Sequence, residues 1–173
     1  MSVIDKNKNS PKWFAVYTKS RSEQKVNKRL EDAGFQSFLP LITEIKQWSD
    51  RKKKVKSPLI KSYVFVKVRN NDLVSLYSIP GVVSILKFLG EPAVVTEVEI
   101  NNLKILANNS EAAKVIGPCF LKSGMPVQVV HGPLEGLIGV CISSKGNHRV
   151  IVKVEALNNF LEVTLPLSHI KKI

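Results

Sequence analysis

The chain has 173 residues, with 26 lysines and arginines against 14 aspartates and glutamates, so its formal net charge is +12. A hydrophobic content of 44% excludes a wholly disordered protein, and the basic excess favours a polyanionic partner, nucleic acid first and an anionic membrane second. No membrane-spanning apolar run, secretion signal or disulfide framework occurs, so we expect a cytoplasmic protein with unpaired thiols at Cys119 and Cys141.

The N-terminal part predicts a tail, a strand and a helix. Residues 1–11 are polar and predict a disordered tail, and Trp13–Thr18 is a strand rich in aromatic and β-branched residues. Ser20 and Glu23 have the spacing of a capping box, which predicts that a helix begins here. The helix runs to Ala33, because apolar residues recur with the helical period at Val26, Leu30 and Ala33.

The next elements are a short strand and a basic hairpin. Phe35–Leu39 predicts a strand that is closed by Pro40. Leu41–Trp48 and Val55–Ile60 predict the two arms of the hairpin. The segment between them, Ser49–Lys54, carries four basic residues and predicts the turn at the hairpin tip.

The run Tyr63–Val68 predicts a well-buried strand, because five of its six residues are β-branched or aromatic. Side chains alternate along a strand, so its three valines share one face, which we expect to face the core. Tyr63 and Phe65 share the other face. A second layer of core is the commoner cover for such a face, and a partner protein is the alternative.

Three further elements complete this half of the chain. Asn70–Tyr77 predicts a short helix, Val82–Phe88 a strand and Gly90–Pro92 a turn. Thr96 and Glu99 form a second pair with capping-box spacing. The helix that they open has an apolar face made of Ile100, Leu103, Leu106 and Ala107.

These elements predict two domains after the tail. Residues 12–107 predict an α+β domain, an α/β sandwich on a mostly antiparallel sheet. Residues 108–121 lack periodicity and predict a linker. Residues 122–173 predict a small all-β barrel, because short apolar runs alternate with turns rich in glycine, proline and asparagine. The runs are Val127–Val130, Leu137–Ile142, Val150–Val154 and Phe160–Leu165.

The glycines of the C-terminal part carry a resemblance. Gly132 and Pro133 turn the chain out of one strand, and Gly136 and Gly139 permit a tight bend and close packing at the start of the next. The segment Gly124–Val140 resembles a KOW motif. The β-branched run within Val150–Val154 favours a strand of the barrel over a helix.

The N-terminal half resembles the N-terminal domain of the NusG family of transcription elongation factors. The matching stretches are W-F-A-V-Y-T-K at 13–19, P-L-I-K-S-Y-V-F-V at 58–66 and I-P-G-V-V at 79–83. With the KOW motif, the resemblance covers Lys12–Ile173. It is strongest to the specialised RfaH-like and UpxY-like antiterminators, because the hairpin within Leu41–Val66 is short.

The resemblance implies a protein partner. In this family the N-terminal domain docks an apolar surface of its sheet on the clamp helices of RNA polymerase and bridges the DNA cleft. The residues at the matching positions are Tyr17, Tyr63 and Phe65. They share one face if the first strand and Tyr63–Val68 are neighbours, which would explain an uncovered aromatic face.

The resemblance also implies that a basic edge near the first helix reads the exposed non-template DNA strand. The matching residues are Lys19, Lys25 and Arg29, with Arg51 and Lys52 at the hairpin tip. An ordinary solvated face is the alternative. Two positions depart from the family pattern: Pro80 replaces a basic residue of RfaH-like proteins, and Lys61-Ser62 replaces the usual Pro-Gly or Pro-Asn before the tyrosine.

The resulting hypothesis is a specialised elongation and antitermination factor that keeps RNA polymerase processive on particular operons. The alternatives are a general NusG acting with Rho, and a ribosome-associated or RNA-binding KOW protein without polymerase contact. The resemblance implies that the KOW barrel contacts a small-subunit ribosomal protein, Rho or both. No metal-ligand spacing, phosphate-binding loop or nucleophile–base pair occurs, so the sequence predicts neither a cofactor nor enzyme activity.

Overall fold

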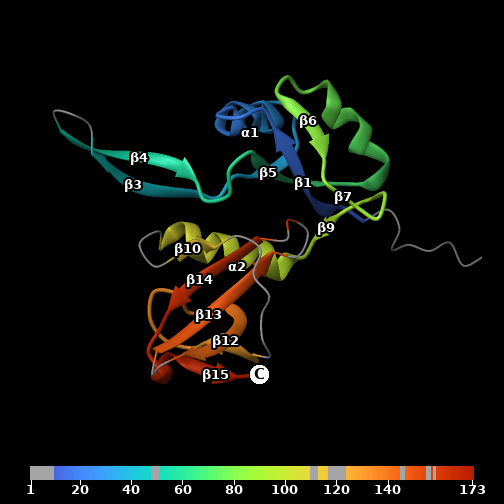
Figure 1. Cartoon of the computed structure of the whole chain (residues 1–173). Coiled ribbons are helices and arrows are strands. Elements are labelled where there is room, and N and C mark those ends of the chain that lie inside the picture. Colours follow the sequence, from blue (N-terminus) through green and yellow to red (C-terminus); the bar gives the residue numbers. More distant parts are fainter. Residues whose placement is uncertain are drawn as a thin grey trace, which may run out of the picture. The chain divides into compact units, whose positions relative to one another are not determined.

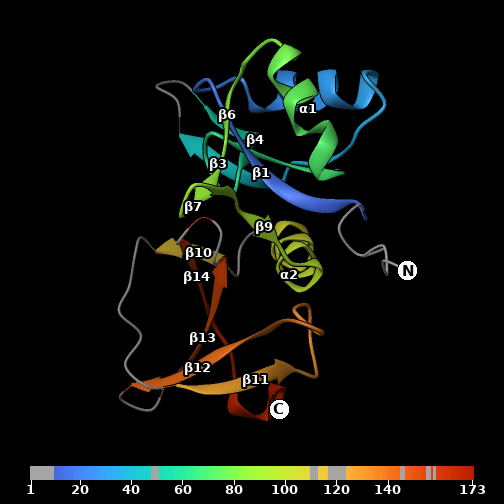
Figure 2. The same ribbon diagram turned by 90° about the vertical axis from the view of Figure 1, so that its right-hand side faces the viewer.

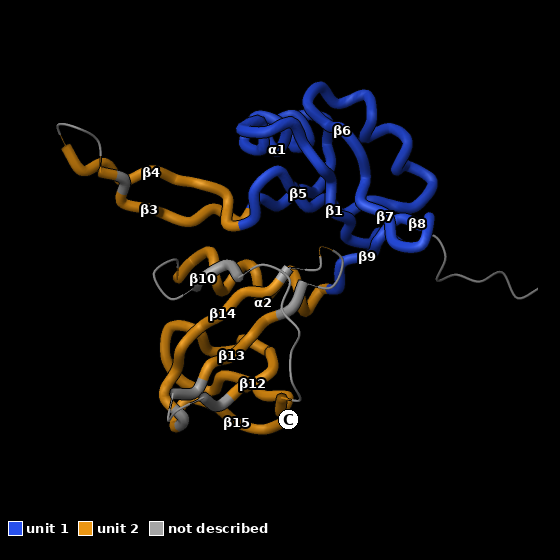
Figure 3. Tube along the Cα trace, viewed as in Figure 1, with its two compact units in different colours: residues 1–39, 60–96 blue, residues 40–59, 97–173 orange. Residues whose placement is uncertain are grey.

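The structure is a computed structural model that describes residues 10–47, 51–109, 113–116, 124–144, 147–154, 157 and 159–173 (Figure 1). The chain forms two compact units (Figure 3). Unit 1 contains residues 1–39 and 60–96, and unit 2 contains residues 40–59 and 97–173. The boundaries of these units differ from the predicted domain boundaries. The predicted hairpin and the helix that precedes the predicted linker belong to unit 2, together with the C-terminal part.

Unit 1 is built on an antiparallel sheet with the order β2-β5-β1-β6, and β9 also pairs with β1. The strands are β1 (Lys12–Thr18), β2 (Gln36–Phe38), β5 (Tyr63–Val68), β6 (Val82–Ile85) and β9 (Val94–Val95). The pairing of β1 with β5 confirms that these two strands are neighbours. Tyr17 lies opposite Tyr63, and Ala15 lies opposite Phe65.

Helix α1 (Glu23–Asp32) and the 3-10 helix η1 (Asn70–Ser78) lie on the same side of this sheet (Figure 2). Two apolar residues of each helix are buried, as are the three valines of β5 that were expected to face the core, whereas Val74 and Tyr77 of η1 are exposed. The buried helix residues are Val26, Leu30, Leu73 and Leu76. The predicted apolar face of the first helix is confirmed at Val26 and Leu30. Ala33 is exposed and is the C-cap, so the helix ends at Asp32 and not at the predicted Ala33.

The predicted capping box at the start of this helix is wrong. Helix α1 begins at Glu23 after the N-cap residue Ser22, whose side chain makes no capping hydrogen bond. Glu23 is therefore the first helical residue and not the third, so its carboxylate is not placed to reach back to the N-cap amide. The carboxylate instead accepts a hydrogen bond from the backbone N–H of Ser62 at 2.8 Å, and Glu23 is buried.

The predicted strand Val82–Phe88 is two strands. After β6, the N–H of Leu86 donates to the carbonyl of Ala15, and the chain then forms a small hairpin from β7 (Lys87–Phe88) and β8 (Glu91–Pro92). The turn of this hairpin is Leu89-Gly90, where both residues have positive φ angles of 51° and 88°. Such angles are those of a tight two-residue hairpin turn.

Unit 2 contains a two-stranded ribbon, a helix and a six-stranded antiparallel sheet. The ribbon consists of β3 (Leu41–Gln47) and β4 (Lys52–Pro58), and the helix is α2 (Glu97–Asn108). The six-stranded sheet has the order β10-β14-β13-β12-β11-β15. Its strands are β10 (Ala113–Ile116), β11 (Met125–Val129), β12 (Ile138–Ser144), β13 (Asn147–Val154), β14 (Asn159–Thr164) and β15 (Ile170–Lys172), with the 3-10 helix η3 (Leu167–His169) before the last.

The C-terminal β structure follows the predicted runs, and β13 contains the run that favoured strand over helix. Strand β10 is a difference, because it lies inside the segment 108–121 that was predicted as a linker, and it pairs with β14. Its sequence, Ala-Lys-Val-Ile, does not alternate strictly between apolar and polar residues, so the two-residue period of a strand did not reveal it. Within the part of the chain that the structure describes, no helix is both long and apolar enough to cross a membrane.

Helix α2 is attached to the β structure of unit 2 by asparagine side chains. The amide of Asn102 donates to the carbonyl of Ile138 at 2.8 Å and accepts from its N–H at 3.0 Å. The amide of Asn109 donates to the carbonyl of Pro133 at 2.7 Å. Asn102 is buried, and its amide finds both a donor and an acceptor in the backbone of Ile138.

Candidate functional site

The most distinctive surface feature of unit 1 is an aromatic pair formed by Tyr17 and Tyr63. The two residues lie directly opposite each other on β1 and β5, and their ring centroids are 5.4 Å apart in an edge-to-face arrangement. Tyr17 is 40% exposed and Tyr63 is half-buried. Burial first, and the neighbouring Tyr17 second, raise the pKa of Tyr63 above its ordinary value of 10.0. Tyr63 is therefore neutral at physiological pH.

The turn before Tyr63 is fixed from two sides. The N–H of Thr18 donates to the carbonyl of Ser62 at 2.8 Å, and the N–H of Ser62 donates to the buried carboxylate of Glu23 at 2.8 Å. Ser62 has a φ angle of 64°, a left-handed conformation that glycine and asparagine adopt more readily. This conformation explains why serine is unusual at a position where the family has glycine or asparagine.

Phe65 lies on the same face of β5 as Tyr63, but it is fully buried. Its ring centroid is 6.3 Å from that of Phe38 on β2. Trp13 on β1 is also buried, with the Lys67 ammonium 5.8 Å from the centroid of its ring. This part of the aromatic face is therefore a second layer of core, and the structure brings only Tyr17 and Tyr63 to the surface.

The basic residues predicted near the first helix are exposed. Lys19 follows β1, and Lys25 and Arg29 lie one turn apart on α1. The guanidinium of Arg29 donates a hydrogen bond to the carbonyl of Pro80. This hydrogen bond holds the cation of Arg29 at the Pro80 carbonyl.

Gly81 lets this loop approach helix α1. Its φ angle is 101°, and a Cβ atom here would lie 2.8 Å from a methyl group of Val26. The Gly81 carbonyl accepts from the N–H of Lys19 at 2.9 Å. The segment Ile79–Gly81 therefore links the end of β1 to the basic face of α1.

The other two predicted nucleic-acid contacts, Arg51 and Lys52, belong to unit 2. Lys52 is on β4, opposite Gln47, so the predicted tip Ser49–Lys54 is too long and its last three residues continue the strand. Residues 48–50 lie outside the described part of the chain. A run of basic residues resembles a turn in sequence, but an exposed strand carries the same residue types.

The sequence reasoning missed the extension of the basic surface along β4. Lys54 and Lys56 are exposed like Lys52, and Ile45 on β3 is 63% exposed opposite Lys54. The signal that could have found this surface is the alternation of lysine at 52, 54 and 56, which places all three side chains on one face of a strand.

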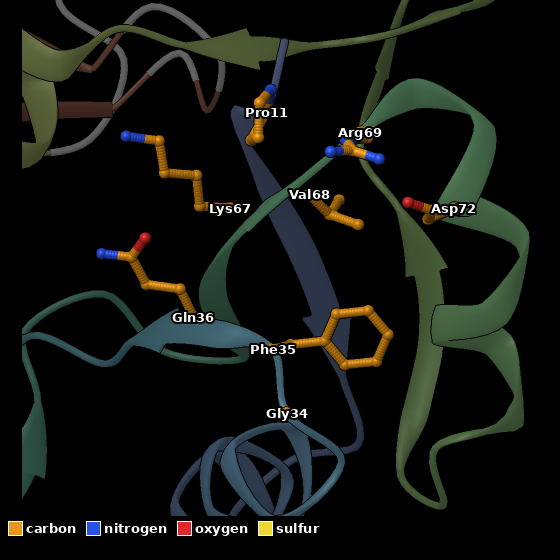
Figure 4. Close-up of a pocket in the computed structure, with 8 residues that line it drawn as sticks. All are labelled: Pro11, Gly34, Phe35, Gln36, Lys67, Val68, Arg69 and Asp72. Atoms are coloured by element: carbon orange, nitrogen blue, oxygen red, sulfur yellow. The ribbon is translucent and has the colours of Figure 1, made fainter. Parts of the chain in front are cut away.

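A hollow of about 330 Å³ lies in unit 1 (Figure 4). It is lined by Pro11, Gly34, Phe35, Gln36, Lys67, Val68, Arg69 and Asp72. Gln36 and Lys67 extend to one side of the β2–β5 pair, and Phe35 and Val68 extend to the other (Figure 4). Its polar groups do not converge on one point. Among the described residues, no group of three or more histidine, cysteine or acidic side chains is placed to hold a metal ion.

An α+β domain with an aromatic pair on its sheet, followed by an all-β segment, is the architecture that the sequence resemblance implied. The family model described as "Transcription termination factor nusG" matches residues 11–104. The chain therefore belongs to the NusG family. Its relatives are transcription factors and not enzymes.

Two relatives are named transcription termination/antitermination protein NusG. The protein of Helicobacter pylori strain J99 is 26% identical, and the match covers 93% of this chain and 98% of the relative. The protein of Rickettsia prowazekii strain Madrid E is 28% identical, with 99% and 95% covered. A solved structure titled "Domain interaction in Thermotoga maritima NusG" is 26% identical, covers 94% of this chain and 97% of that chain, and has a TM-score of 0.49.

Proposed function

We propose that this chain is a specialised transcription elongation and antitermination factor that binds the clamp helices of RNA polymerase through Tyr17 and Tyr63. The observation that carries the proposal is the contact between Tyr17, 40% exposed, and Tyr63, half-buried, at the end of a strand pair whose other aromatic residues are buried. Large exposed aromatic side chains are typical anchors of protein interfaces. A factor that binds the closed clamp more tightly than the open clamp favours the processive state.

In this proposal Phe65 supports the interface from below. Its buried ring packs near Phe38 and keeps β5 in place beneath the tyrosine pair. The fold therefore contributes a rigid platform, which lowers the entropy cost of ordering side chains when the partner binds.

The basic residues have a second role in the proposal, contact with the non-template DNA strand of the elongation complex. These residues are Lys19, Lys25, Arg29, Arg51 and Lys52, all exposed. The C-terminal KOW domain, residues 122–173, would serve a different partner, a small-subunit ribosomal protein or Rho. The N-terminal domain of residues 12–107, joined to it by the linker 108–121, would carry the polymerase and DNA contacts.

The test is binding to purified core RNA polymerase, measured by interferometry with the wild type and the Tyr17→Ala/Tyr63→Ala variant. Interface hot spots contribute about 2 kcal/mol or more, so we expect a loss of affinity of roughly 30-fold or more. Tyr77→Ala is the matched control, because Tyr77 is 48% exposed in the same unit but lies on η1. Circular dichroism must show that both variants are folded.

Three outcomes separate the proposal from its alternatives. Equal binding by the tyrosine variant and the control would remove the pair from the interface. Polymerase occupancy across the whole genome, instead of on particular operons, would favour a general NusG acting with Rho. A wild type that binds neither polymerase nor a paused elongation complex would favour a ribosome-associated or RNA-binding KOW protein.

A further inference from the structure

The hairpin formed by β7 and β8 ends in two large apolar side chains that face water. Phe88 is 69% exposed, and Leu89 is 89% exposed, a larger fraction than for any other large apolar side chain in the described part of the chain. We call these two residues the apolar tip. Because both side chains are exposed, packing in the core of unit 1 does not explain why they are apolar.

Leu89 also has an unfavourable backbone conformation. Its φ angle is 51°, in the left-handed region, and Gly90 follows with a φ angle of 88°. Two-residue hairpin turns with such angles favour Asn-Gly or Asp-Gly, because a residue with a large side chain crowds its own backbone there. Backbone strain of this kind is concentrated at functional sites. The combination of strain and exposure at one leucine therefore points to a binding surface.

The base of the hairpin holds the apolar tip in place. The N–H of Ala93 donates to the carbonyl of Leu86 at 2.9 Å, and the N–H of Leu86 donates to the carbonyl of Ala15 on β1, also at 2.9 Å. Ala93 is buried. The hairpin is thus attached to the sheet of unit 1, so a partner that binds the apolar tip does not have to order a free loop.

The apolar tip lies near the tyrosine pair, because the hairpin follows directly after β6. Tyr17 lies opposite Ser84 of β6, and Phe88 is four residues further along the chain. An extended chain spans at most about 3.6 Å per residue, so the Cα atoms of Ser84 and Phe88 are at most about 14 Å apart. A partner surface of standard size, about 800 Å² on each side, is wide enough to cover both features.

The charges of the hairpin favour a protein partner over a polyanion. Glu91 lies opposite Phe88, and directly opposed residues of an antiparallel pair point to the same side. The exposed carboxylate of Glu91 therefore lies beside Phe88, where it would repel nucleic-acid phosphates or an anionic membrane. Lys87 adds one positive charge, so the hairpin has no net charge. An apolar pocket of a protein is the surface that fits these side chains.

We propose that the apolar tip is a second anchor of this protein on RNA polymerase, with Phe88 and Leu89 buried in an apolar pocket of the polymerase. The choice of polymerase as the partner rests on the proposed function, which places unit 1 on it through Tyr17 and Tyr63. Burial of the apolar tip removes two large side chains from water at the moment of binding.

Exposed apolar residues without any partner are the competing explanation, because single apolar side chains are common on protein surfaces. The substitution Leu89→Asn separates the two explanations. Asparagine followed by Gly90 forms the preferred turn, so this substitution should stabilise the hairpin whatever Leu89 binds. It should weaken binding to polymerase only if the leucine side chain contacts the polymerase.

The test is interferometry of the full chain with purified core RNA polymerase. The variants are Leu89→Asn and Phe88→Thr/Leu89→Asn, in which threonine keeps a β-branched residue in the strand. The matched control is Ile45→Thr/Met125→Gln, which removes two exposed apolar side chains from unit 2. Thermal unfolding followed by circular dichroism measures the stability of each variant.

We expect Leu89→Asn to raise the melting temperature by roughly 1 to 3 °C. The same variant should weaken polymerase binding by roughly 5-fold, and the double variant should weaken it by roughly 30-fold, the scale of an interface hot spot. The control should bind like the wild type. The phenolate titration of Tyr63 should be the same in the double variant and the wild type, which would show that the tyrosine pair is undisturbed.

Equal polymerase binding by the wild type and the double variant would overturn the inference, as would a loss of the same size in the control. A double variant that keeps polymerase but loses binding to anionic vesicles or single-stranded DNA would also overturn it, because the partner would then be a polyanion. If Tyr17→Ala/Tyr63→Ala keeps polymerase while the double variant loses it, only the proposed tyrosine site fails. A wild type that does not bind polymerase would overturn both proposals.

Discussion

Two antiparallel strand pairs of this protein have the same backbone pattern and opposite surroundings. In the β1–β5 pair of unit 1, most side chains on both faces are buried, and the exposed aromatic surface is limited to the end where Tyr17 meets Tyr63. In the described part of the β3–β4 ribbon, no side chain within the paired strands is fully buried. The hydrogen-bonded ladder alone therefore does not decide what a strand pair does.

The difference lies in the alternating side chains. The β1–β5 pair places the valines and Phe14 on one face and its other aromatic residues on the other, and most of these side chains are buried. The ribbon places lysines at every second residue of β4, which keeps one face in water. The sheet pair stabilises the fold and exposes one small anchor, whereas the ribbon contributes little core and offers a long charged surface.

Of the substitutions that compare the β1–β5 pair with the β3–β4 ribbon, Phe65→Ala is expected to have the largest effect on the free energy of unfolding. Removing a fully buried aromatic ring costs about 3 to 5 kcal/mol, because a cavity remains where the ring packed. Ile45→Ala on the ribbon is the matched change and should stay within about 0.5 kcal/mol, because Ile45 is 63% exposed. Urea unfolding followed by circular dichroism measures both.

This comparison also decides what Phe65 does. A Phe65→Ala protein with nearly unchanged unfolding free energy but weakened polymerase binding would make Phe65 an interface residue. A destabilised protein that binds polymerase normally below its unfolding transition would keep it as core. For this reason the polymerase test uses Tyr17 with Tyr63 and leaves Phe65 intact.

A smaller loss of unfolding free energy is expected when the hydrogen bond between the Ser62 N–H and the Glu23 carboxylate is removed. Glu23→Ala leaves the backbone N–H of Ser62 without its carboxylate partner, and an unsatisfied buried donor costs about 1 to 3 kcal/mol. Asp32→Ala is the control, since Asp32 is an exposed carboxylate on the same helix. Equal unfolding free energies for the two variants would mean that the Glu23 contact does not stabilise the turn.

Local patterns predicted the elements of both regions. The alternation in Tyr63–Val68 and the helical period of Val26 and Leu30 depend on neighbours in sequence, and both are found in the structure. The capping-box prediction failed because the partner of Glu23 is Ser62, 39 positions away. No spacing within the helix contains that information.

The sequence also predicted only part of the candidate site. The opposition of Tyr17 and Tyr63 required only that two predicted strands be neighbours. The burial of Phe65 depends on packing with Phe38, which comes from another strand, so alternation could not show it. The basic surface along β4 was truncated in the prediction because residues 52–54 were assigned to a turn and not to β4.

A gain of stability is expected at Ser62. Its φ angle of 64° is unfavourable for serine, and asparagine tolerates this conformation better. Ser62→Asn should raise the unfolding free energy by about 0.5 to 1 kcal/mol, in the range of single stabilising changes. Ser62→Ala lacks this tolerance and should give no gain. A destabilised Ser62→Asn protein would show that the serine side chain itself is required at this turn.

The smallest effect on stability is expected from the ionisation of Tyr63. It tests whether the tyrosine pair is a neutral, partly buried anchor. The folded-state pKa of Tyr63 is raised above 10.0, so the folded chain holds this proton more tightly than the unfolded chain. This contribution to stability is complete below pH 10.0 and is lost as the pH rises through the folded-state pKa. The wild type should therefore lose stability relative to Tyr63→Phe only in the alkaline range, with no difference at neutral pH.

Phenolate absorbance as a function of pH measures this ionisation directly. Tyr17→Phe should lower the pKa of Tyr63 only in part, because burial is the larger cause and the neighbouring Tyr17 the smaller. A Tyr63 that titrates at its ordinary value of 10.0 in the folded wild type would mean that the ring is solvated. The pair would then lack the partly desolvated, preorganised surface that makes it a candidate anchor.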